Sequence, residues 1–194
     1  MEETMKIIEL TQGKRAMVSD IDYPIVNKYV WYYQSRSHRE GRASLLGYAA
    51  RSFKGKTFRM QNQIMQPKKG EIVDHINGNS LDNRRENLRI CTIAENNRNA
   101  PLRKDSKSGY KGVTKHVTGS WRARVQVNGK NKAIYTKTKE MAAFAYNVMA
   151  LHYYGEFARL NEIDWISLDP ELAMEKLKNT YPDSYKKLIN YKGE

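Results

Sequence analysis

The chain has 194 residues, with 34 Lys or Arg against 21 Asp or Glu, and a formal net charge of +13. No apolar run reaches the roughly 18 residues of a membrane span, and the N-terminal Met-Glu-Glu-Thr-Met-Lys lacks the hydrophobic core of a signal peptide. The single cysteine, Cys91, excludes an intramolecular disulfide and a cysteine-based zinc site. We therefore expect a soluble intracellular protein of a reducing cytoplasm, with no membrane partner.

The positive charge gathers in two blocks. Residues 51–70 hold six Lys or Arg and no acid, and residues 103–139 hold eleven against Asp105 alone. One such run is usually only a solvated face, but two blocks in one chain favour a polyanion bound along the molecule, most simply double-stranded DNA. In the first block the residues expected to contact DNA are Arg51, Lys54, Lys56 and Arg59.

Residues 1–70 have the composition of a β-rich part. Aromatic and β-branched residues predict strands at Ile7–Leu10, Ala16–Val18, Tyr29–Tyr33 and Leu45–Phe53. Turns are expected at Gln12–Gly13 and Lys54–Lys56. A short helix is expected after Asp22, with Asp22 as its cap and Pro24 in its first turn.

The segment Val73–Asn99 is rich in asparagine, with seven Asn and four Arg in 27 residues. Asparagine forms both helices and strands poorly, so we expect these side chains to do specific work. Glu71–Ile76 and Leu88–Cys91 are predicted strands, joined through turn-forming residues. Thr92 and Glu95 have the spacing of a capping box, which predicts a helix start. The segment therefore predicts a ββα unit.

Hydrolysis of a phosphodiester needs a base to deprotonate water and a cation to neutralise the negative charge on the phosphate. An ordinary histidine is largely neutral at physiological pH, so His75 is the candidate base. Asp74 offers a carboxylate oxygen and Asn96 an amide oxygen, and both are ligands that suit Mg²⁺ or Mn²⁺. Adjacent strand residues point to opposite faces, so a pocket shared by Asp74 and His75 requires a bend or bulge.

The stretch from Glu71 to Ala100 resembles the HNH endonuclease motif. Eleven residues separate His75 from Asn87, and eight separate Asn87 from Asn96, which is the spacing of that family. The resemblance implies that His75 is the general base, that Asn87 braces the hairpin and orients the base, and that Asp74 and Asn96 hold one metal ion. Asn96 stands where the last histidine of the motif is usual, which favours Mg²⁺ or Mn²⁺ over zinc. The pattern resembles phage and intron-encoded, homing-type enzymes.

Other polar residues of this segment have simpler expected roles. Asn97 and Asn99 are expected on the helix surface, although Asn99 lies one turn after Asn96 and could support the site. Arg89 is expected to bind phosphate, whereas Arg84 and Arg85 could equally balance nearby acids. Loop bracing is expected of Asn77, Asn79, Asp82 and Asn83.

A polar linker at residues 101–109 precedes a second pattern. Strands are predicted at Tyr110–Lys115, Trp121–Val127 and Asn131–Lys137, with the hairpin signal Asn128-Gly129 between the last two. A helix is predicted over Thr138–Tyr154, because apolar residues recur at three- and four-residue steps until Gly155. These elements predict a three-stranded antiparallel sheet packed on one helix.

Residues alternate strictly along Trp121–Val127, so the apolar side chains should meet the helix and the polar ones should face outward. The outward residues Arg122, Arg124 and Gln126 could contact bases in the major groove. Four lysines are expected close to them: Lys111, Lys115, Lys130 and Lys132. The segment Ser108–Asn161 resembles the AP2/ERF DNA-binding domain, which implies major-groove binding through the sheet.

The predicted fold class is α+β. The predicted parts are a β-rich DNA-contacting part (1–70), an HNH ββα-metal core (71–100), a linker (101–109), an AP2-like module (110–161) and a helical tail (162–194). We expect a monomeric, homing-type DNA endonuclease that nicks one strand. The alternative is a DNA-binding regulator with an inactive HNH remnant, against which the intact Asp74, His75, Asn87 and Asn96 argue. An RNA-directed protein is a second, weaker alternative.

Overall fold

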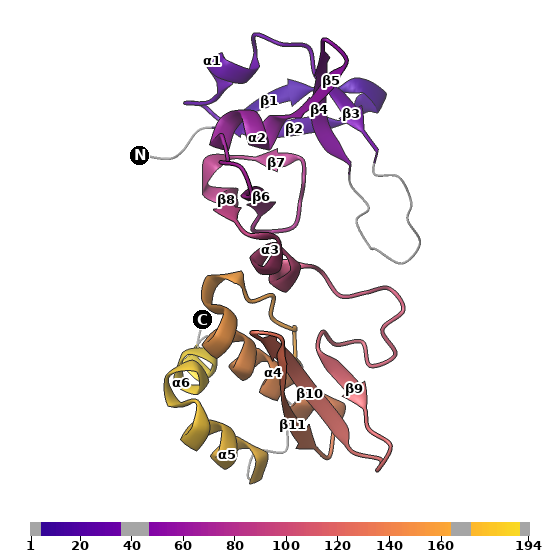
Figure 1. The fold of residues 1–194 in the computed structure, drawn as a ribbon, viewed down its shortest axis with the longest axis vertical. Coiled ribbons are helices and arrows are strands. Elements are labelled where there is room, and N and C mark those ends of the chain that lie inside the picture. The colour runs from indigo at the N-terminus through magenta and orange to yellow at the C-terminus, as the bar shows by residue number, and fades with distance from the viewer. Residues whose placement is uncertain (1–4, 36–46, 164–171, 191–194) are drawn as a thin grey trace. The chain divides into compact units, whose positions relative to one another are not determined.

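The computed structural model describes residues 5–35, 47–163 and 172–190, and the chain divides into two compact units, residues 1–99 and 100–194 (Figure 1). Each unit has its own hydrophobic core. The mixture of small sheets and helices confirms the α+β class.

The N-terminal unit contains three small sheets (Figure 1). One sheet pairs β1 (Met5–Glu9) antiparallel with β2 (Arg15–Ser19), and β2 pairs in parallel with the short β7 (Asp82–Asn83). A second sheet has the order β3-β4-β5, with bounds Tyr32–Gln34, Tyr48–Phe53 and Lys56–Arg59. The predicted hairpin turn is confirmed at Lys54 and Gly55, whose φ angles of 48° and 72° are positive.

The third sheet and a helix form the predicted ββα unit. β6 (Ile72–His75) pairs antiparallel with β8 (Leu88–Cys91), and α3 (Ile93–Asn99) follows directly. The capping box is confirmed, because the Thr92 amide donates to Glu95 Oε2 at 2.8 Å and the Glu95 amide donates to Thr92 Oγ1 at 3.3 Å. A short 3-10 turn, η2 (Arg85–Asn87), leads into β8.

One hydrophobic core joins the first 70 residues to the ββα unit. Val18 of β2, Met60, Leu81 and Leu88 belong to the same buried cluster. The β2–β7 pairing adds a backbone connection between the two segments. The ββα unit is therefore built on the N-terminal sheet rather than standing apart from it.

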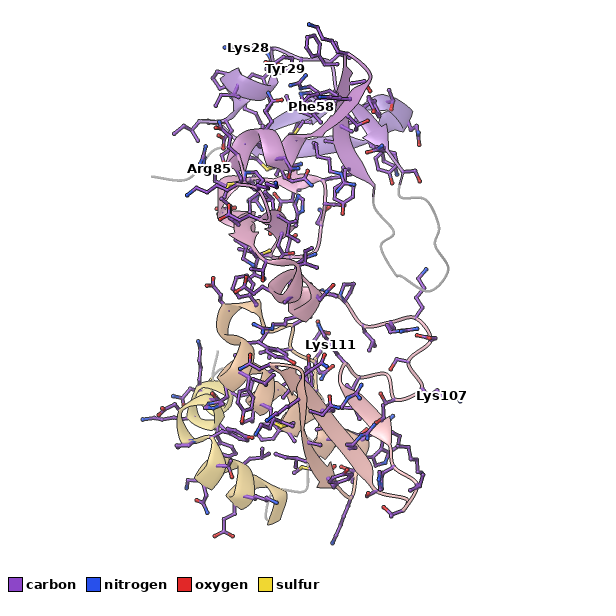
Figure 2. All side chains as sticks on the ribbon, viewed as in Figure 1. Lys28, Tyr29, Phe58, Arg85, Lys107 and Lys111 are labelled. Carbon is purple, nitrogen blue, oxygen red and sulfur yellow. The ribbon has the colours of Figure 1, made fainter. Side chains whose placement is uncertain are left out.

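Three local features of this unit differ from the sequence predictions. α1 (Tyr23–Val26) forms as expected, but Asp22 makes no side-chain cap, because its carboxylate accepts from Arg85 Nη2 at 2.8 Å (Arg85 is labelled in Figure 2). The helix α2 (Met60–Met65) lies in a region predicted as strands. The aromatic run Tyr29–Tyr33 is a strand only from Tyr32 onward.

The C-terminal unit contains the predicted three-stranded sheet and helix. The strand order is β11-β10-β9, with bounds Lys130–Thr136, Trp121–Val127 and Val113–Lys115, and all pairings are antiparallel. α4 (Lys139–Tyr154) packs against this sheet and ends at Gly155, where the short η3 (Gly155–Phe157) begins. Thr138 caps α4 by accepting from the Met141 amide at 3.2 Å.

The C-terminal tail belongs to the same core. α5 (Leu172–Thr180) and α6 (Pro182–Asn190) contribute Leu177 and Leu188 to the buried cluster around α4, and Tyr181 between them belongs to the same cluster. This second layer explains why α4 is buried continuously from Met141 to Ala150. The part of the tail around Pro170 lies outside the described residues. Within the described residues, no helix is long and apolar enough to cross a membrane.

Candidate active site

Asp74 is held between a strand and a helix. Its Oδ2 accepts from Arg89 Nη2 at 2.7 Å and from Arg89 Nε at 3.0 Å, since Arg89 is its cross-strand partner on β8. Asn99 Nδ2 from α3 donates to the same oxygen at 3.0 Å and also to the backbone carbonyl of His75 at 3.1 Å. Asp74, Arg89 and Asn99 therefore form one buried polar group. The expectation that Asn99 lies on the helix surface was wrong, because it is 7% exposed.

His75 points to other partners. Its Nε2 lies 3.3 Å from Oδ1 of Asn83, and its ring centroid lies 6.5 Å from that of Tyr48. The register of β6 and β8 is continuous from Ile72 to His75, so the expected bulge is not present in this pairing, and the Asp74 and His75 side chains leave β6 on opposite faces. The buried Asn83 side chain is the hydrogen-bond partner of the Nε2 atom of His75.

The asparagines of the loop between β6 and β8 brace its backbone. Asn87 Oδ1 accepts from the Asn77 amide at 2.9 Å, and Asn87 Nδ2 donates to the Asp82 carbonyl at 2.8 Å. Asn77 Oδ1 accepts from the Asn79 amide at 2.7 Å, and Asn79 Oδ1 accepts from the Leu81 amide at 3.1 Å. Loop bracing by Asn77 and Asn79 is confirmed, and Asn87 has the contacts expected of a residue that fixes the hairpin.

Asp82 is the ionic centre of that loop. Its two oxygens accept from Arg84 Nε and Nη2, both at 2.8 Å, and Oδ2 also accepts from Asn77 Nδ2 at 2.9 Å. The Arg84 hydrogen bonds hold the pKa of this carboxyl below its ordinary value, against the opposing effect of burial. Arg84 and Arg85 thus balance nearby acids within the fold, the second of the two roles considered for them.

The donor set fits a hard divalent cation. Asn96 and Asn99 are one turn apart on α3, so Asn96 lies on the side of the helix from which Asn99 reaches Asp74. A carboxylate and a neutral amide oxygen are ligands that Mg²⁺ and Mn²⁺ take, with further positions left for phosphate and water. Among the described residues, no group of three His, Cys, Asp or Glu side chains is placed to hold a metal ion. Arg89 shares the Asp74 carboxylate that such an ion would use.

Comparison with known proteins agrees with this geometry. Residues 66–98 match the family described as HNH endonuclease. The uncharacterized HNH endonuclease L560 of Acanthamoeba polyphaga mimivirus is 36% identical over 159 residues, covering 79% of this chain and 78% of that protein. The chain belongs to the HNH endonuclease family. Protein 3.8 of Escherichia phage T7 is 33% identical over 93 residues, covering 47% of this chain and 76% of that protein. No solved structure gives a significant match.

The chain is therefore a nuclease of the HNH type, and the predicted enzyme class is confirmed. The family match ends at residue 98, before the C-terminal unit. That unit has the predicted three-stranded sheet on a helix, while its membership of the AP2/ERF family stays a prediction. The homing type stays a prediction as well.

In the first basic block of this HNH nuclease, each cation lies against an aromatic ring or in solvent. Arg59 lies 4.2 Å from the centroid of the Tyr48 ring, and Tyr48 in turn lies beside His75. Lys54 lies 5.4 Å from the Phe53 ring at the tip of the β4–β5 hairpin, and Lys56 is exposed. Arg59 is thus the predicted DNA contact connected most directly to the candidate base.

The second basic block is distributed over both faces of the C-terminal sheet. Ala123 and Val125 are buried against α4, while Arg124 and Gln126 are exposed on the opposite face, as predicted. Arg122 shares that face and donates from Nε to Thr114 Oγ1 at 3.3 Å.

Three of the lysines expected near these residues lie on the neighbouring strands, but on the other face of the sheet. Lys132 pairs with Val125, Lys130 with Val127, and Lys115 with Trp121. Paired residues of antiparallel strands share a face, so these lysines extend from the margins of the face that packs on α4. The polar face holds Asn131 and Ala133 as the partners of Gln126 and Arg124.

Lys111 is engaged within the fold. Its Nζ donates to the Ala100 carbonyl at 2.6 Å, and its backbone amide donates to Asn161 Oδ1 at 2.6 Å. Burial lowers the pKa of Lys111 to about 8. A phosphate contact by Lys111 would require it to leave the Ala100 carbonyl.

Sequence reasoning missed one contact and misplaced another. Asn83 was expected only to brace the loop, but it is 0% exposed and its side chain meets His75. Arg89 was expected at phosphate, but it lies on Asp74. The signal for Arg89 was available, since two ββα strands of these lengths place Asp74 and Arg89 directly opposite each other.

Proposed function

We propose that this nuclease is a site-specific, homing-type DNA endonuclease that hydrolyses one phosphodiester with one divalent metal ion. The observation that carries the proposal is the position of Asp74 and His75 at the end of β6, directly before a loop braced by asparagines, with Asp74 hydrogen-bonded to Asn99 of α3. A bound Mg²⁺ or Mn²⁺ supplies positive charge that neutralises the phosphate and the leaving oxygen.

The side chains have separate roles in this proposal. His75 takes the proton of the attacking water, and Asn83 holds the ring through the contact between its Oδ1 and Nε2 of His75. Asn87 keeps the loop in position through the Asn77 amide and the Asp82 carbonyl. Asp74 and Asn96 would hold the metal ion, and Arg89, which is paired with Asp74 without metal, would be released by that ion to bind the scissile phosphate.

DNA binding is assigned to both units. In the N-terminal unit the contacts are Arg51, Lys54, Lys56 and Arg59 on the β3-β4-β5 sheet and its hairpin. In the C-terminal unit Arg122, Arg124 and Gln126 contact bases through the polar face of the sheet. Lys115, Lys130 and Lys132 lie at the sheet margins, where phosphate contacts are the expected use of a point charge.

A plasmid assay tests the proposal. Protein is incubated with supercoiled DNA in Mg²⁺, Mn²⁺ or Zn²⁺, or with chelator, and nicked circles are measured. We expect cleavage with Mg²⁺ or Mn²⁺ and a higher metal requirement for Asp74→Ala and Asn96→Ala. Activity with zinc alone would contradict the assigned donor set, and cleavage in chelator would contradict metal dependence.

A further inference from the structure

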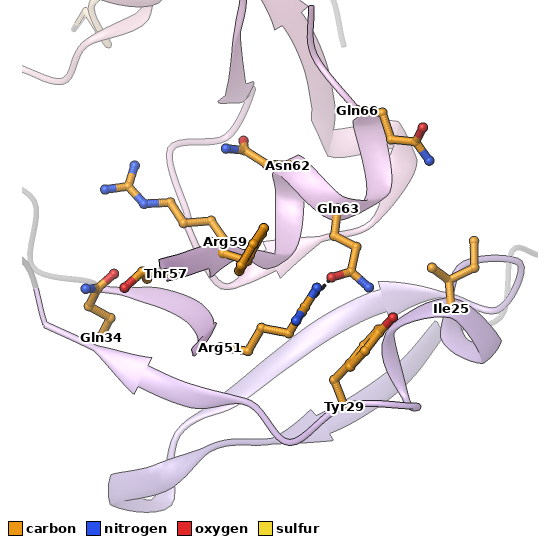
Figure 3. Close-up of a pocket in the computed structure, with 10 residues that line it drawn as sticks. Ile25, Tyr29, Gln34, Arg51, Thr57, Arg59, Asn62, Gln63 and Gln66 are labelled. Carbon is orange, nitrogen blue, oxygen red and sulfur yellow. Dashed lines mark hydrogen bonds between the residues drawn. The ribbon is translucent and has the colours of Figure 1, made fainter. Parts of the chain in front are cut away.

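A groove on the N-terminal unit is lined by two arginines, Arg51 and Arg59. The groove has a volume of about 620 Å³ and lies between α2 and the β3-β4-β5 sheet (Figure 3). Arg51 lies in its middle, and Figure 3 shows its guanidinium directed at Gln63 of α2, with Tyr29 close by. None of the ten lining residues is acidic. The groove therefore suits a ligand that carries hydrogen-bond acceptors.

The Arg51 guanidinium is fixed in orientation. Its central carbon lies 4.1 Å from the Tyr29 ring centroid and 4.6 Å from the Phe58 ring centroid, so two aromatic rings lie against the guanidinium. Its Nε donates to Gln63 Oε1 at 2.8 Å. Among the described residues no acceptor reaches the two Nη atoms. The in-plane Nη edge is therefore the part of Arg51 left for a ligand.

A ligand for that edge needs two acceptors side by side in one plane. A guanine in the major groove offers O6 and N7 in this arrangement, and a phosphate offers two oxygens. Arg59, the second arginine of the lining, lies against the Tyr48 ring, and the side-chain amides of the lining favour the base. Asn62, Gln63 and Gln66 both donate and accept hydrogen bonds, as base edges do, whereas a phosphate only accepts.

The apolar part of the lining agrees with this choice. Ile25, Tyr29 and Phe58 line the groove and are 41%, 43% and 38% exposed. Apolar side chains contact the methyl group of thymine, and they add nothing to phosphate binding. The two rings against Arg51 also lower its conformational freedom before DNA binds, which makes the contact selective.

We infer that Arg51 is a specificity-determining residue that binds the O6/N7 edge of one guanine in the nuclease's DNA site. The inference rests on the proposed DNA-cleaving function and adds one base contact in the N-terminal unit. The side-chain amides of Asn62 and Gln66 bind the neighbouring base edges. Gln63 holds the Arg51 guanidinium in plane by accepting from its Nε.

The test selects DNA sites from a random-sequence duplex library with wild type, Arg51→Ala and Arg51→Lys. Wild type should enrich a guanine at one position where both variants show none. Preferences elsewhere should remain, and discrimination at that position should fall roughly 5- to 150-fold. Replacing that guanine by 7-deazaguanine, which lacks N7, should weaken wild-type binding and leave Arg51→Ala binding unchanged.

Lys56→Ala is the matched control, because it removes one exposed positive charge from the neighbouring strand and should weaken all sequences equally. The same uniform loss for Arg51→Ala would make Arg51 a phosphate contact and overturn the inference. An unchanged guanine preference in Arg51→Ala would also overturn it. After either of these results, plasmid cleavage by wild type would still support the proposed function. If wild type neither selects nor cuts DNA, the inference and the proposed function are both overturned.

Discussion

Arg89 Nη2 lies 2.7 Å from Oδ2 of Asp74, and the two side chains are 10% and 7% exposed. A buried carboxylate that is paired in this way is stable without a metal ion, but removing one partner leaves an uncompensated buried charge. The arginine thus occupies the carboxylate assigned to metal binding, and a divalent ion has to compete with it.

The first prediction is that Arg89→Ala makes stability depend on metal. Without metal, the variant should lose about 3–5 kcal/mol of unfolding free energy, because Asp74 is left buried and charged. Mn²⁺ should restore part of this loss and stabilise the variant more than wild type, since the ion meets no competitor. Urea unfolding with and without Mn²⁺ measures both effects.

The control for this prediction is the double variant Asp74→Asn, Arg89→Ala, which removes both charges. Mn²⁺ should hardly change its stability. Equal stabilisation of wild type and Arg89→Ala by Mn²⁺ would show that Arg89 does not compete for the metal-binding carboxylate.

The second prediction concerns the two faces of the C-terminal sheet. Arg124 lies on the polar face of the sheet. Lys132 lies on the adjacent strand β11, and its pairing with Val125 puts it on the opposite face. Arg124→Ala should cost about 1–3 kcal/mol on the preferred site and relax discrimination, whereas Lys132→Ala should weaken specific and random DNA alike. Competition binding against both DNAs makes the comparison, and equal behaviour of the two variants would contradict base contact by Arg124.

The third prediction concerns acid stability. Arg84 lowers the pKa of Asp82, so the stabilisation is complete above the ordinary pKa of 3.8 and is lost as pH falls through the lower pKa of the folded state. At pH 7, Asp82→Asn should cost about 1–3 kcal/mol, because Arg84 and Asn77 lose a charged acceptor. The difference from wild type should shrink towards pH 2 in urea unfolding. A constant difference across that range would assign the loss to packing instead.

Much of the fold could be predicted from local signals in the sequence. The Thr92–Glu95 capping box, the Asn128-Gly129 hairpin and the apolar spacing of α4 each depend on residues a few positions apart, and all three are present. The helix α2 lacks such a signal: it is six residues long and has no side-chain cap. β7 is two residues long and exists only through its pairing with β2, which no local pattern encodes.

The sequence predicted which residues belong to the candidate site. It did not predict all of their side-chain contacts. The spacing from His75 to Asn96 identified the family, because that spacing depends on one continuous ββα unit. The contacts of Asn83 and Asn99 depend on how the loop and α3 fold back onto β6. Asparagine patterns alone do not distinguish a loop brace from a residue that holds the base.

The fourth prediction concerns strand number. The chain has one HNH match, and one metal site supports attack on one phosphodiester at a time. At concentrations where light scattering shows a monomer, supercoiled plasmid should become open circle well before linear DNA appears. Linear product from the outset, without a nicked intermediate, would indicate a dimer that cuts both strands together.

The most direct test of His75 as the base is cleavage by His75→Ala under saturating Mg²⁺, with DNA affinity measured in parallel. The base acts on water and does not hold the duplex, so the variant should bind DNA nearly as wild type does and cleave about 10²- to 10⁴-fold more slowly. A variant that cuts at close to the wild-type rate would show that His75 is not the base and that the proposed catalytic site is wrong.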